Sequence, residues 1–383
     1  MAEATRRSAP SGAREHAPRD AYRAAGVDVD AGERAVALMR EAVASTRRPE
    51  VVGGLGGFAG AIEIPAGYRR PLLVASTDGV GTKTALARAA GLLGGLGIDL
   101  VAMCADDVVC AGAEPLFLLD YVAVGRLVPE EVAAIVAGVA SGCRAAGCAL
   151  LGGETAEHPG TMAPADLDLA AMCVGVVEYD EVIDGSAVRA GDVLVGLAAS
   201  GLHSNGFSLV RRLVAGAGLR LDAPFAEILA SRAAGVAPEP EYAASSLGDV
   251  LLAPTRIYSR AVLAMRAAVR TAGGDLHAVA HVTGGGLPGA VPRIVPDGLA
   301  ARMDPAAWPM PSVMQLLGTL GGLGAAELRA TFNGGLGMVA AVPAAAVDAA
   351  LATAAAAGIG AYVAGEIVPA ADLGGRRYVE VER

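Results

Sequence analysis

Short apolar runs recur along this chain, and most of them lead through a glycine-containing turn into a stretch with helical periodicity. Such an alternation predicts an α/β (α+β) fold built around β-sheets. It begins near residue 21 and starts afresh near residue 191, so we expect a disordered tail (1–20) and two domains (21–180 and 181–383). The expected strands are 71–76, 116–124, 148–151, 169–177, 192–198, 276–282, 338–342 and 361–367; the expected helices are 31–46, 84–90, 98–111, 129–147, 207–214, 255–270 and 344–357, with a polar connection at 221–249.

The amino-acid composition indicates which motifs are the best candidates for a functional site. The 383 residues include one lysine, Lys83, and two asparagines, Asn205 and Asn333, although lysine is normally among the commonest residues. A G+C-rich genome is the simplest cause, because lysine and asparagine have A-rich codons. We therefore treat each remaining lysine or asparagine as a position where the residue was kept against the bias towards G+C-rich codons. A hydrophobic fraction of 54% excludes a disordered protein.

Charge and cysteine usage exclude several classes of protein. The net charge is −10, which argues against a nucleic-acid partner because such binding needs a basic face. The five cysteines form no CxxC pair and no zinc spacing, which is typical of buried thiols in a reducing cytosol. Residues 1–20 lack the apolar segment of a secretory signal, and the uncharged stretch 349–365 is too short to span a membrane. We expect a soluble, cytoplasmic protein without a membrane partner.

The only lysine lies in the sequence Thr-Asp-Gly-Val-Gly-Thr-Lys-Thr (77–84), between an expected strand and an expected helix. Gly79 and Gly81 would let backbone N–H groups approach an anion, the helix N-terminus favours negative charge, and Lys83 supplies a compact positive charge. A Walker A loop needs glycine directly before its lysine, and here Thr82 intervenes, so a P-loop ATPase is disfavoured. The motif predicts a phosphate contact for Lys83 in preference to an exposed surface role.

Acidic residues accompany this motif. Asp78 lies in the loop, Asp106 and Asp107 interrupt an otherwise apolar helix, and Glu154 follows two glycines at the end of an expected strand. Carboxylates in apolar surroundings are costly unless a metal or a base neutralises them. Few basic residues lie near them in sequence, so Mg²⁺ bound together with nucleotide phosphates is the simplest partner.

Two more glycine-containing turns follow strands in the second half. Residues 200–207 read Ser-Gly-Leu-His-Ser-Asn-Gly-Phe; Ser204 or Asn205 could cap the next helix, and His203 could pack, cap or transfer protons. Thr283 and the glycines 284–286 offer a second anion site. One such site in each half is better explained by two phosphorylated ligands than by one.

The order of these motifs resembles the phosphoribosylformylglycinamidine cyclo-ligase (AIR synthetase) family of purine biosynthesis, from about residue 22 to the C-terminus. Residues 46–51 with 53–58 resemble the family's glycine-rich nucleotide loop. The other matching tracts are 77–83, 112–117 with 119–121, 152–157, 203–206, 253–258 and 283–286.

The resemblance implies a homodimer whose N-terminal domains jointly form a β-barrel, with nucleotide sites between subunits and a C-terminal α/β domain. It implies the ATP-dependent cyclisation of formylglycinamidine ribonucleotide to 5-aminoimidazole ribonucleotide, with release of ADP and phosphate. The residues it implies are His203, Asp78 and Lys83 for catalysis; Gly53, Gly54, Gly56, Gly57, Asp78, Gly79, Gly81, Thr82, Lys83, Asp107 and Glu154 for ATP; Asp78, Asp107 and Glu154 for Mg²⁺; and Ser204, Asn205, Thr283, Gly284, Gly285 and Gly286 for the phosphorylated ribonucleotide.

The chain departs from the family pattern at a few positions. Asp106 stands where the family usually has asparagine, which would add negative charge beside the metal. Gly289 and Ala290 replace a frequent Glu-Asn pair, and Gly335 stands where cysteine or methionine is commoner. The alternatives are another ATP-dependent member of the superfamily, such as selenophosphate synthetase, thiamine-phosphate kinase or the amidotransferase-linked synthetase, or a weakened nucleotide-binding paralogue that acts as a sensor or scaffold.

Overall fold

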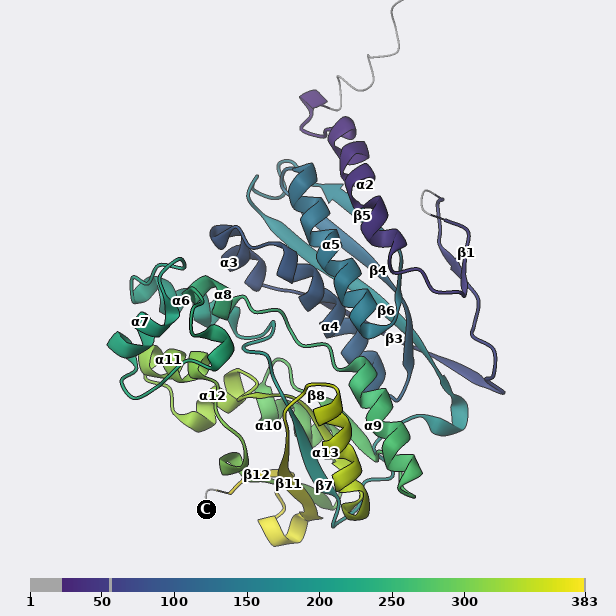
Figure 1. Ribbon diagram of the computed structural model, residues 1–383, viewed down its shortest axis with the longest axis vertical. Helices are drawn as coiled ribbons and strands as arrows, with labels where there is room; N and C mark the ends of the chain where they lie inside the picture. Colours follow the sequence, from purple (N-terminus) through teal and green to yellow (C-terminus); the bar gives the residue numbers. More distant parts are fainter. Residues whose placement is uncertain (1–22, 55–56, 382–383) are drawn as a thin grey trace, which may run out of the picture.

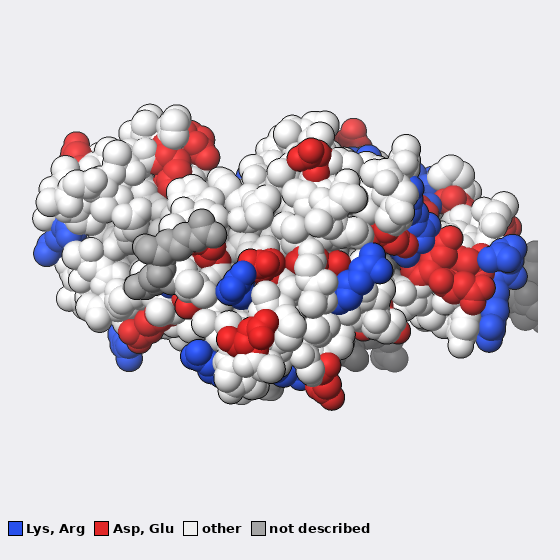
Figure 2. Space-filling model, turned by 90° about the horizontal axis from the view of Figure 1, so that it is seen from below, with Lys and Arg blue, Asp and Glu red and all other residues white. Residues whose placement is uncertain are grey.

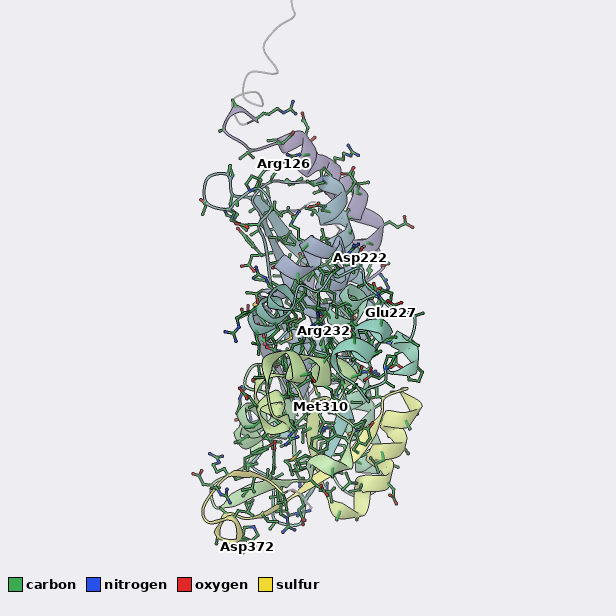
Figure 3. The ribbon with its side chains drawn as sticks, turned by 90° about the vertical axis from the view of Figure 1, so that its left-hand side faces the viewer. Arg126, Asp222, Glu227, Arg232, Met310 and Asp372 are labelled. Atoms are coloured by element: carbon green, nitrogen blue, oxygen red, sulfur yellow. The ribbon has the colours of Figure 1, made fainter. Side chains whose placement is uncertain are left out.

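The structure is a computed structural model that describes residues 23–54 and 57–381. The molecule is elongated and has two parts, each built on a β-sheet (Figure 1). A side view shows the same division along the long axis, with Arg126 towards one end and Asp372 at the other (Figure 3). The expected tail and Gly56 of the expected nucleotide loop lie outside the described residues.

The first part contains a four-stranded sheet in the order β3-β6-β4-β5, in which β4 and β5 are parallel and the other neighbours are antiparallel. Helices α4 and α5 cover one face of this sheet, and α2 packs on α5 (Figure 1). A short antiparallel hairpin, β1 with β2, precedes the sheet. The bounds are α2 (Val29–Ala44), β1 (Val51–Val52), β2 (Ala61–Ile62), β3 (Pro71–Gly79), α3 (Lys83–Ala90), α4 (Gly94–Cys110), β4 (Glu114–Val124), α5 (Pro129–Ala146), β5 (Ala149–Glu157) and β6 (Leu167–Glu178).

Glycine lets α4 and α5 approach closely. A Cβ added to Gly138 would lie 1.9 Å from the Gly94 carbonyl oxygen, and one added to Gly97 would lie 2.2 Å from that of Ile135. Both helices are therefore in backbone contact, which brings α4 down onto the sheet. The acidic residues near the end of α4 consequently lie against β3 and against the second part of the molecule.

The second part contains a six-stranded sheet in the order β12-β9-β11-β7-β10-β8. Helices α9 and α13 pack on one face, and α10 and the segment around Trp308 pack on the other. The strands are β7 (Val193–Ala198), β8 (Ala278–His281), β9 (Leu299–Met303), β10 (Leu336–Val342), β11 (Ala361–Pro369) and β12 (Tyr378–Glu380); the helices are α9 (Ser259–Thr271), α10 (Gly286–Ala290) and α13 (Val347–Ala356).

A group of short helices lies beside this second sheet and shares a hydrophobic core with the first part of the molecule. They are α6 (Phe207–Gly216), α7 (Phe225–Arg232), α8 (Leu247–Leu251), α11 (Ser312–Gly321) and α12 (Ala325–Thr331). The 3₁₀ turns are η1 (Tyr179–Glu181), η2 (Pro240–Tyr242), η3 (Val291–Ile294), η4 (Pro305–Ala307), η5 (Ala344–Ala346) and η6 (Ala370–Leu373).

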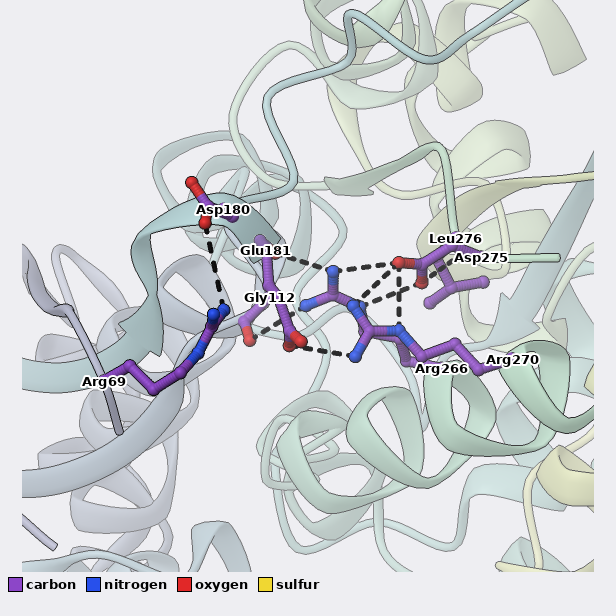
Figure 4. Close-up of polar contacts among 8 residues, drawn as sticks. All are labelled: Arg69, Gly112, Asp180, Glu181, Arg266, Arg270, Asp275 and Leu276. Carbon is purple, nitrogen blue, oxygen red and sulfur yellow. Dashed lines mark hydrogen bonds and ion pairs between the residues drawn. The ribbon is translucent and has the colours of Figure 1, made fainter. Parts of the chain in front are cut away.

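An arginine cluster ties the segment between the two sheets to α9 (Figure 4). Arg266 donates to the Glu181 carbonyl oxygen at 2.6 Å and to Asp275 at 2.9 Å. Arg270 donates to the Glu181 carboxylate at 2.9 Å and to Asp275 at 3.0 Å. These bonds fix the connection and help to set the relative position of the two sheets.

Every expected strand and helix is present, with ends that shift by a few residues. The expected polar connection at 221–249 is wrong in part, because it contains α7 and α8, whose apolar side chains enter the core. The sequence analysis also missed the β1–β2 hairpin, β9, α10, α11, α12 and β12. Most of these elements are short, and short apolar runs carry little periodicity.

Among the described residues, no helix packs on the outer face of the four-stranded sheet. It exposes Leu73, Tyr121 and Met172, whose relative exposures are 56%, 40% and 38%. Within the described residues, no helix is long and apolar enough to cross a membrane. On the face shown in Figure 2, acidic and basic side chains lie in small mixed groups between uncharged areas.

Candidate active site between the two sheets

Two carboxylates meet where α4 packs against β3. Asp78 lies near the end of β3 and Asp107 in the last turn of α4. Ser76, two residues before Asp78 on the same side of the strand, donates from Oγ to Asp107 Oδ2 at 3.1 Å. Burial raises the pKa of Asp78, and the charge of the neighbouring Asp107 raises it further. The pair therefore favours a cation between its members.

His281, at the end of β8 in the second sheet, completes this cluster. Its Nδ1 lies 2.9 Å from Asp107 Oδ1. Burial opposes the ionisation of Asp107, but the hydrogen bonds from His281 and Ser76 outweigh it and hold the pKa of that carboxyl below its ordinary value. Because Nδ1 faces a carboxylate, the proton of the ring is assigned to Nδ1, which donates to Asp107. The Nε2 atom is buried and has no hydrogen-bond partner among the described residues.

A cavity of about 380 Å³ opens beside this cluster, between the two sheets. Ser76 and Asp107 line it from the first part of the molecule, and His281 and Arg293 line it from the second. Its volume lies within the range of small-molecule sites. A carboxylate-oriented imidazole and a guanidinium in one cavity can accept a proton and bind an anion.

The expected metal triad does not assemble within one chain. Among the described residues, no group of three or more histidine, cysteine, aspartate or glutamate side chains could hold a metal ion. Glu154 pairs with Tyr121 across the sheet, so its side chain lies on the open face, whereas Asp78 lies on the face covered by α4. Mg²⁺ is usually bound by one or two carboxylates together with nucleotide phosphates, and Asp78 and Asp107 are the two members of the expected set that lie on the α4 side of the sheet.

Asp106 directs its carboxylate to α9, although its charge still interacts with His281 of this cluster. Its carboxylate points to the start of α9, where it accepts from the Tyr258 N–H at 3.0 Å and the Ser259 hydroxyl at 2.7 Å. A negative charge is favourable at a helix N-terminus. Asp106 therefore links α4 to α9 across the two parts of the molecule.

Lys83, expected at the phosphates, is buried beside Asp99. The residue is 1% exposed. Its Nζ donates to Asp99 and to the carbonyl oxygens of His203 and Ala253, at 2.9, 2.9 and 3.0 Å. All three ammonium protons therefore have protein acceptors, and none is directed at a phosphate site.

His203, expected to be catalytic, does not line this cavity. It is 1% exposed, and its φ of 61° is the only positive value among the described residues other than glycine. Its Nε2 accepts from the Ser200 N–H at 3.2 Å. Burial lowers its pKa well below the ordinary value, and the nearby His281 and Lys83 add to this effect, so the ring is neutral.

The turn after His203 contacts the second glycine-rich turn. A Cβ added to Gly284 would lie 3.5 Å from Asn205 Oδ1, and Ser204 Oγ lies 3.5 Å from Thr255 Oγ1. Gly284 and Gly285 are exposed, whereas Gly286 is buried at the start of α10. Gly286 has a φ of 59°, and a Cβ there would meet the Arg329 carbonyl oxygen at 1.9 Å, so only glycine fits. The structure thus places Asn205 next to the 283–286 turn.

The remaining expected ATP residues lie on two separate loops. Gly53, Gly54 and Gly57 are exposed in the loop between β1 and β2. Gly79 ends β3, and Gly81 and Thr82 are exposed before α3. Thr82 Oγ1 lies 3.1 Å from Ser208 Oγ on α6, so this second loop also contacts the other half of the chain.

Sequence reasoning missed Ser76, His281 and Arg293 as site residues. His281 comes two residues before Thr283, and Ser76 comes two residues before Asp78. Both were therefore beside recognised motifs, and the period of two along a strand was the available signal. Nothing in the sequence alone indicated that Arg293 would reach the same cavity.

Comparison with known proteins defines the class first. The AIR synthase related protein N-terminal domain matches residues 59–177, and the corresponding C-terminal domain matches residues 189–376. Similar folds occur in the hydrogenase maturation protein HypE in complex with ATP (TM-score 0.62, 20% identity, 92% of this chain and 91% of that chain) and in thiamine-monophosphate kinase from Stenotrophomonas maltophilia K279a (TM-score 0.59, 20% identity, 90% and 95%). The chain thus has the two-domain architecture of AIR synthase related proteins.

Relatives narrow the class to one family. A phosphoribosylformylglycinamidine cyclo-ligase from Thermosynechococcus vestitus is 52% identical over 91% of this chain and 97% of its own length. Those from Gloeobacter violaceus and Sorangium cellulosum are 52% and 47% identical, over 86% and 92% of this chain and 91% and 96% of their own lengths. The chain belongs to the phosphoribosylformylglycinamidine cyclo-ligase family.

Proposed function

We propose that this protein closes the imidazole ring of 5-aminoimidazole ribonucleotide from formylglycinamidine ribonucleotide, with conversion of ATP to ADP and phosphate. The observation that carries the proposal is the high identity, over nearly the whole chain, to relatives named for this reaction. The relatives do not favour a kinase or a non-catalytic sensor.

The reaction requires activation of a poor electrophile. ATP phosphorylates the formamide oxygen, an amidine nitrogen of the same molecule attacks the activated carbon, and phosphate leaves. The attacking nitrogen loses one proton, and the imidazole of His281, which lines the cavity beside Asp107, is the proposed acceptor. Arg293 would contact the anionic group, and the fixed arrangement of these groups would supply much of the rate.

The groups of residues in the site indicate where Mg²⁺, the nucleotide and the ribose phosphate would bind. Asp78 and Asp107 would hold Mg²⁺, which neutralises phosphate charge. Gly53, Gly54, Gly57 and the 79–82 loop would bind the nucleotide, and Asn205 with the 283–286 turn would bind the ribose phosphate of the substrate. Lys83 and Glu154 are left out of the phosphate and metal sites, because Lys83 is buried and Glu154 lies on the opposite sheet face.

We further propose a homodimer in which the open faces of two four-stranded sheets combine into a barrel. Exposed Leu73, Tyr121 and Met172 support it, because an uncovered apolar sheet face is a common interaction surface. Residues 21–180 would then serve as the ATP-binding and dimerisation domain and residues 181–383 as the second domain. The pathway would place the protein in the cytoplasm.

The test is an assay of the purified protein with formylglycinamidine ribonucleotide, ATP and Mg²⁺. We expect ADP and the aminoimidazole ribonucleotide together. ADP without the imidazole would point to another ATP-dependent reaction, and nucleotide binding without turnover would point to a sensor.

A further inference from the structure

The only lysine of the chain lies at the junction of its two halves. Lys83 opens α3, and its Nζ is 2.9 and 2.8 Å from the two carboxylate oxygens of Asp99 on α4. The exposures of the two side chains are 1% and 0%. Helix α3 packs against α6 of the second half (Figure 1).

Both members of this pair bind backbone groups from the second half. Lys83 donates to the carbonyl oxygens of His203 and Ala253, and Asp99 Oδ1 accepts from the Thr255 N–H at 2.8 Å and from its hydroxyl at 2.6 Å. A buried ion pair needs such additional bonds to offset the loss of hydration. Two loops that are distant in sequence are thereby fixed to one point of the first half.

One of these loops holds a strained residue. His203 has a left-handed backbone conformation, which is unfavourable for a residue with a side chain and persists only when its surroundings enforce it. The bond from Lys83 reaches the His203 carbonyl, and Ser200 binds the ring. A Cβ at Gly337 would lie 2.5 Å from His203 Cε1, so the ring is also packed tightly. Asn205, two residues later, then meets Gly284.

Only an ammonium fits these acceptors. Nζ has three tetrahedral donors and three protein partners, whereas a guanidinium is planar, larger and has five donors. Burial lowers the pKa of Lys83, and Asp99 opposes that effect. The G+C-rich composition would favour arginine here, so the geometry gives a reason for the retained lysine.

We propose that Lys83 and Asp99 are a positioning pair that clamps the 200–206 loop across the two halves and so presets the surface formed by Asn205 and the 283–286 turn for the ribose phosphate of the substrate. The inference rests on the proposed function for the identity of that ligand. The contacts that clamp the 200–206 loop do not depend on the proposed function, and separate experiments test the clamp and the function.

The first experiment exploits the fact that the chain has one lysine, and it does not require an activity assay. Native protein is treated with an acetylating N-hydroxysuccinimide ester, with and without Mg-ATP, and the peptide containing Lys83 is analysed by mass spectrometry. We expect Lys83 to stay unmodified in both samples and to react fully after unfolding in guanidinium. Native labelling that ATP prevents would show a phosphate ligand and would overturn the clamp.

The second experiment distinguishes an effect on ribonucleotide binding from an effect on ATP binding. For Lys83→Met and Lys83→Arg, we expect KM for the ribonucleotide to rise about tenfold or more, because small displacements of binding groups are costly, while KM for ATP changes less than about twofold. Arg88→Met is the matched control, since Arg88 lies on the same helix but pairs with Glu131 within the first half. A rise confined to KM for ATP would contradict the proposal.

A double variant distinguishes positioning from stability. Lys83→Met leaves a buried carboxylate without its cation, so Lys83→Met/Asp99→Asn should regain much of the lost thermal stability while keeping an acceptor for Thr255. Ribonucleotide KM should remain high, because the His203 carbonyl still lacks its donor. Recovery of KM together with stability would reduce the pair to a structural role and overturn the proposal. Absence of turnover in the unmutated protein would instead refute the proposed function and leave the labelling result standing.

Discussion

At the scale of single residues, chemistry depends on which side chains reach the cavity. Asp107 orients His281 through Nδ1, and both residues line the cavity between the two sheets. Lys83 and His203 were the more conspicuous residues in the sequence, yet both are buried outside the cavity. Lys83 donates to the His203 carbonyl oxygen and His203 Nε2 accepts from Ser200, whereas His203 Nδ1 has no hydrogen-bond partner among the described residues. Composition revealed that Lys83 is constrained, but it could not reveal whether a ligand or the protein imposes the constraint.

Replacement of His281 by asparagine should lower kcat by about 10²- to 10⁴-fold, the usual contribution of a proton acceptor. The measurement is steady-state kinetics at saturating ATP and ribonucleotide, with circular dichroism to confirm folding. Ser76→Ala is the matched control: it removes the other hydrogen bond to Asp107 but leaves the imidazole, so a much smaller decrease is expected. Equal decreases in both variants would contradict a direct role for His281.

Asp120 should make stability depend on pH. Burial raises its pKa to about 7, and its Oδ2 has no partner among the described residues. The folded protein therefore holds a proton that the unfolded chain releases near its ordinary pKa, and stability falls as pH rises from about 4 to about 7. Asp120→Asn should remove this loss, with a gain of up to about 4 kcal/mol above pH 7 at 1.36 kcal/mol per pKa unit.

Urea unfolding between pH 4 and pH 8 measures the Asp120 effect. The exposed Asp348→Asn serves as the control and should leave the pH profile unchanged. Parallel profiles for wild-type protein and Asp120→Asn would show that the carboxyl is ionised in the folded state.

At the scale of elements, periodicity identified the long strands and helices because each keeps one face in the core. It failed for α7 and α8, which are short and lie in a segment rich in polar residues and proline. It also could not show that α4 and α5 touch through their backbones, since that contact depends on glycines opposite each other in space. The spacing of apolar residues indicates which face of a helix or strand is buried. It does not indicate which other element packs against that face.

Gly138→Ala should destabilise the protein by about 1–3 kcal/mol or more, because the added methyl overlaps the Gly94 carbonyl and must push α4 away from α5. Gly32→Ala is the control, since a Cβ there meets nothing within 4 Å and a helical glycine-to-alanine change gains about 0.5–1 kcal/mol. Thermal unfolding measures both. An unchanged Tm for Gly138→Ala would mean that the helices can separate without cost.

At the scale of the whole molecule, the motifs placed the site only in part. The order of motifs predicted the family and the two-part architecture, and Asp78 and Asp107 do lie together. The cavity, however, combines a strand end from each sheet, and only the packing of α4 against both parts brings His281 to Asp107. No local pattern encodes a contact between residues 174 positions apart.

Leu73→Glu should convert the proposed dimer to a monomer, because it places a charge on the uncovered face of the four-stranded sheet. Analytical ultracentrifugation gives the molecular mass. Val363→Glu alters a similarly exposed side chain, 49% accessible, on the second sheet and should leave the dimer intact. A wild-type monomer, or dimers in both variants, would argue against the barrel.

The yield of aminoimidazole ribonucleotide per ADP, measured in the same reaction for wild-type protein and for Asp107→Asn, tests the central claim most directly. We expect one imidazole product for each ADP from the wild-type protein, and a loss of both products together in the folded Asp107→Asn variant. ADP formation without ring closure by the wild-type protein, or undiminished turnover by Asp107→Asn, would contradict ATP-driven cyclisation at this site.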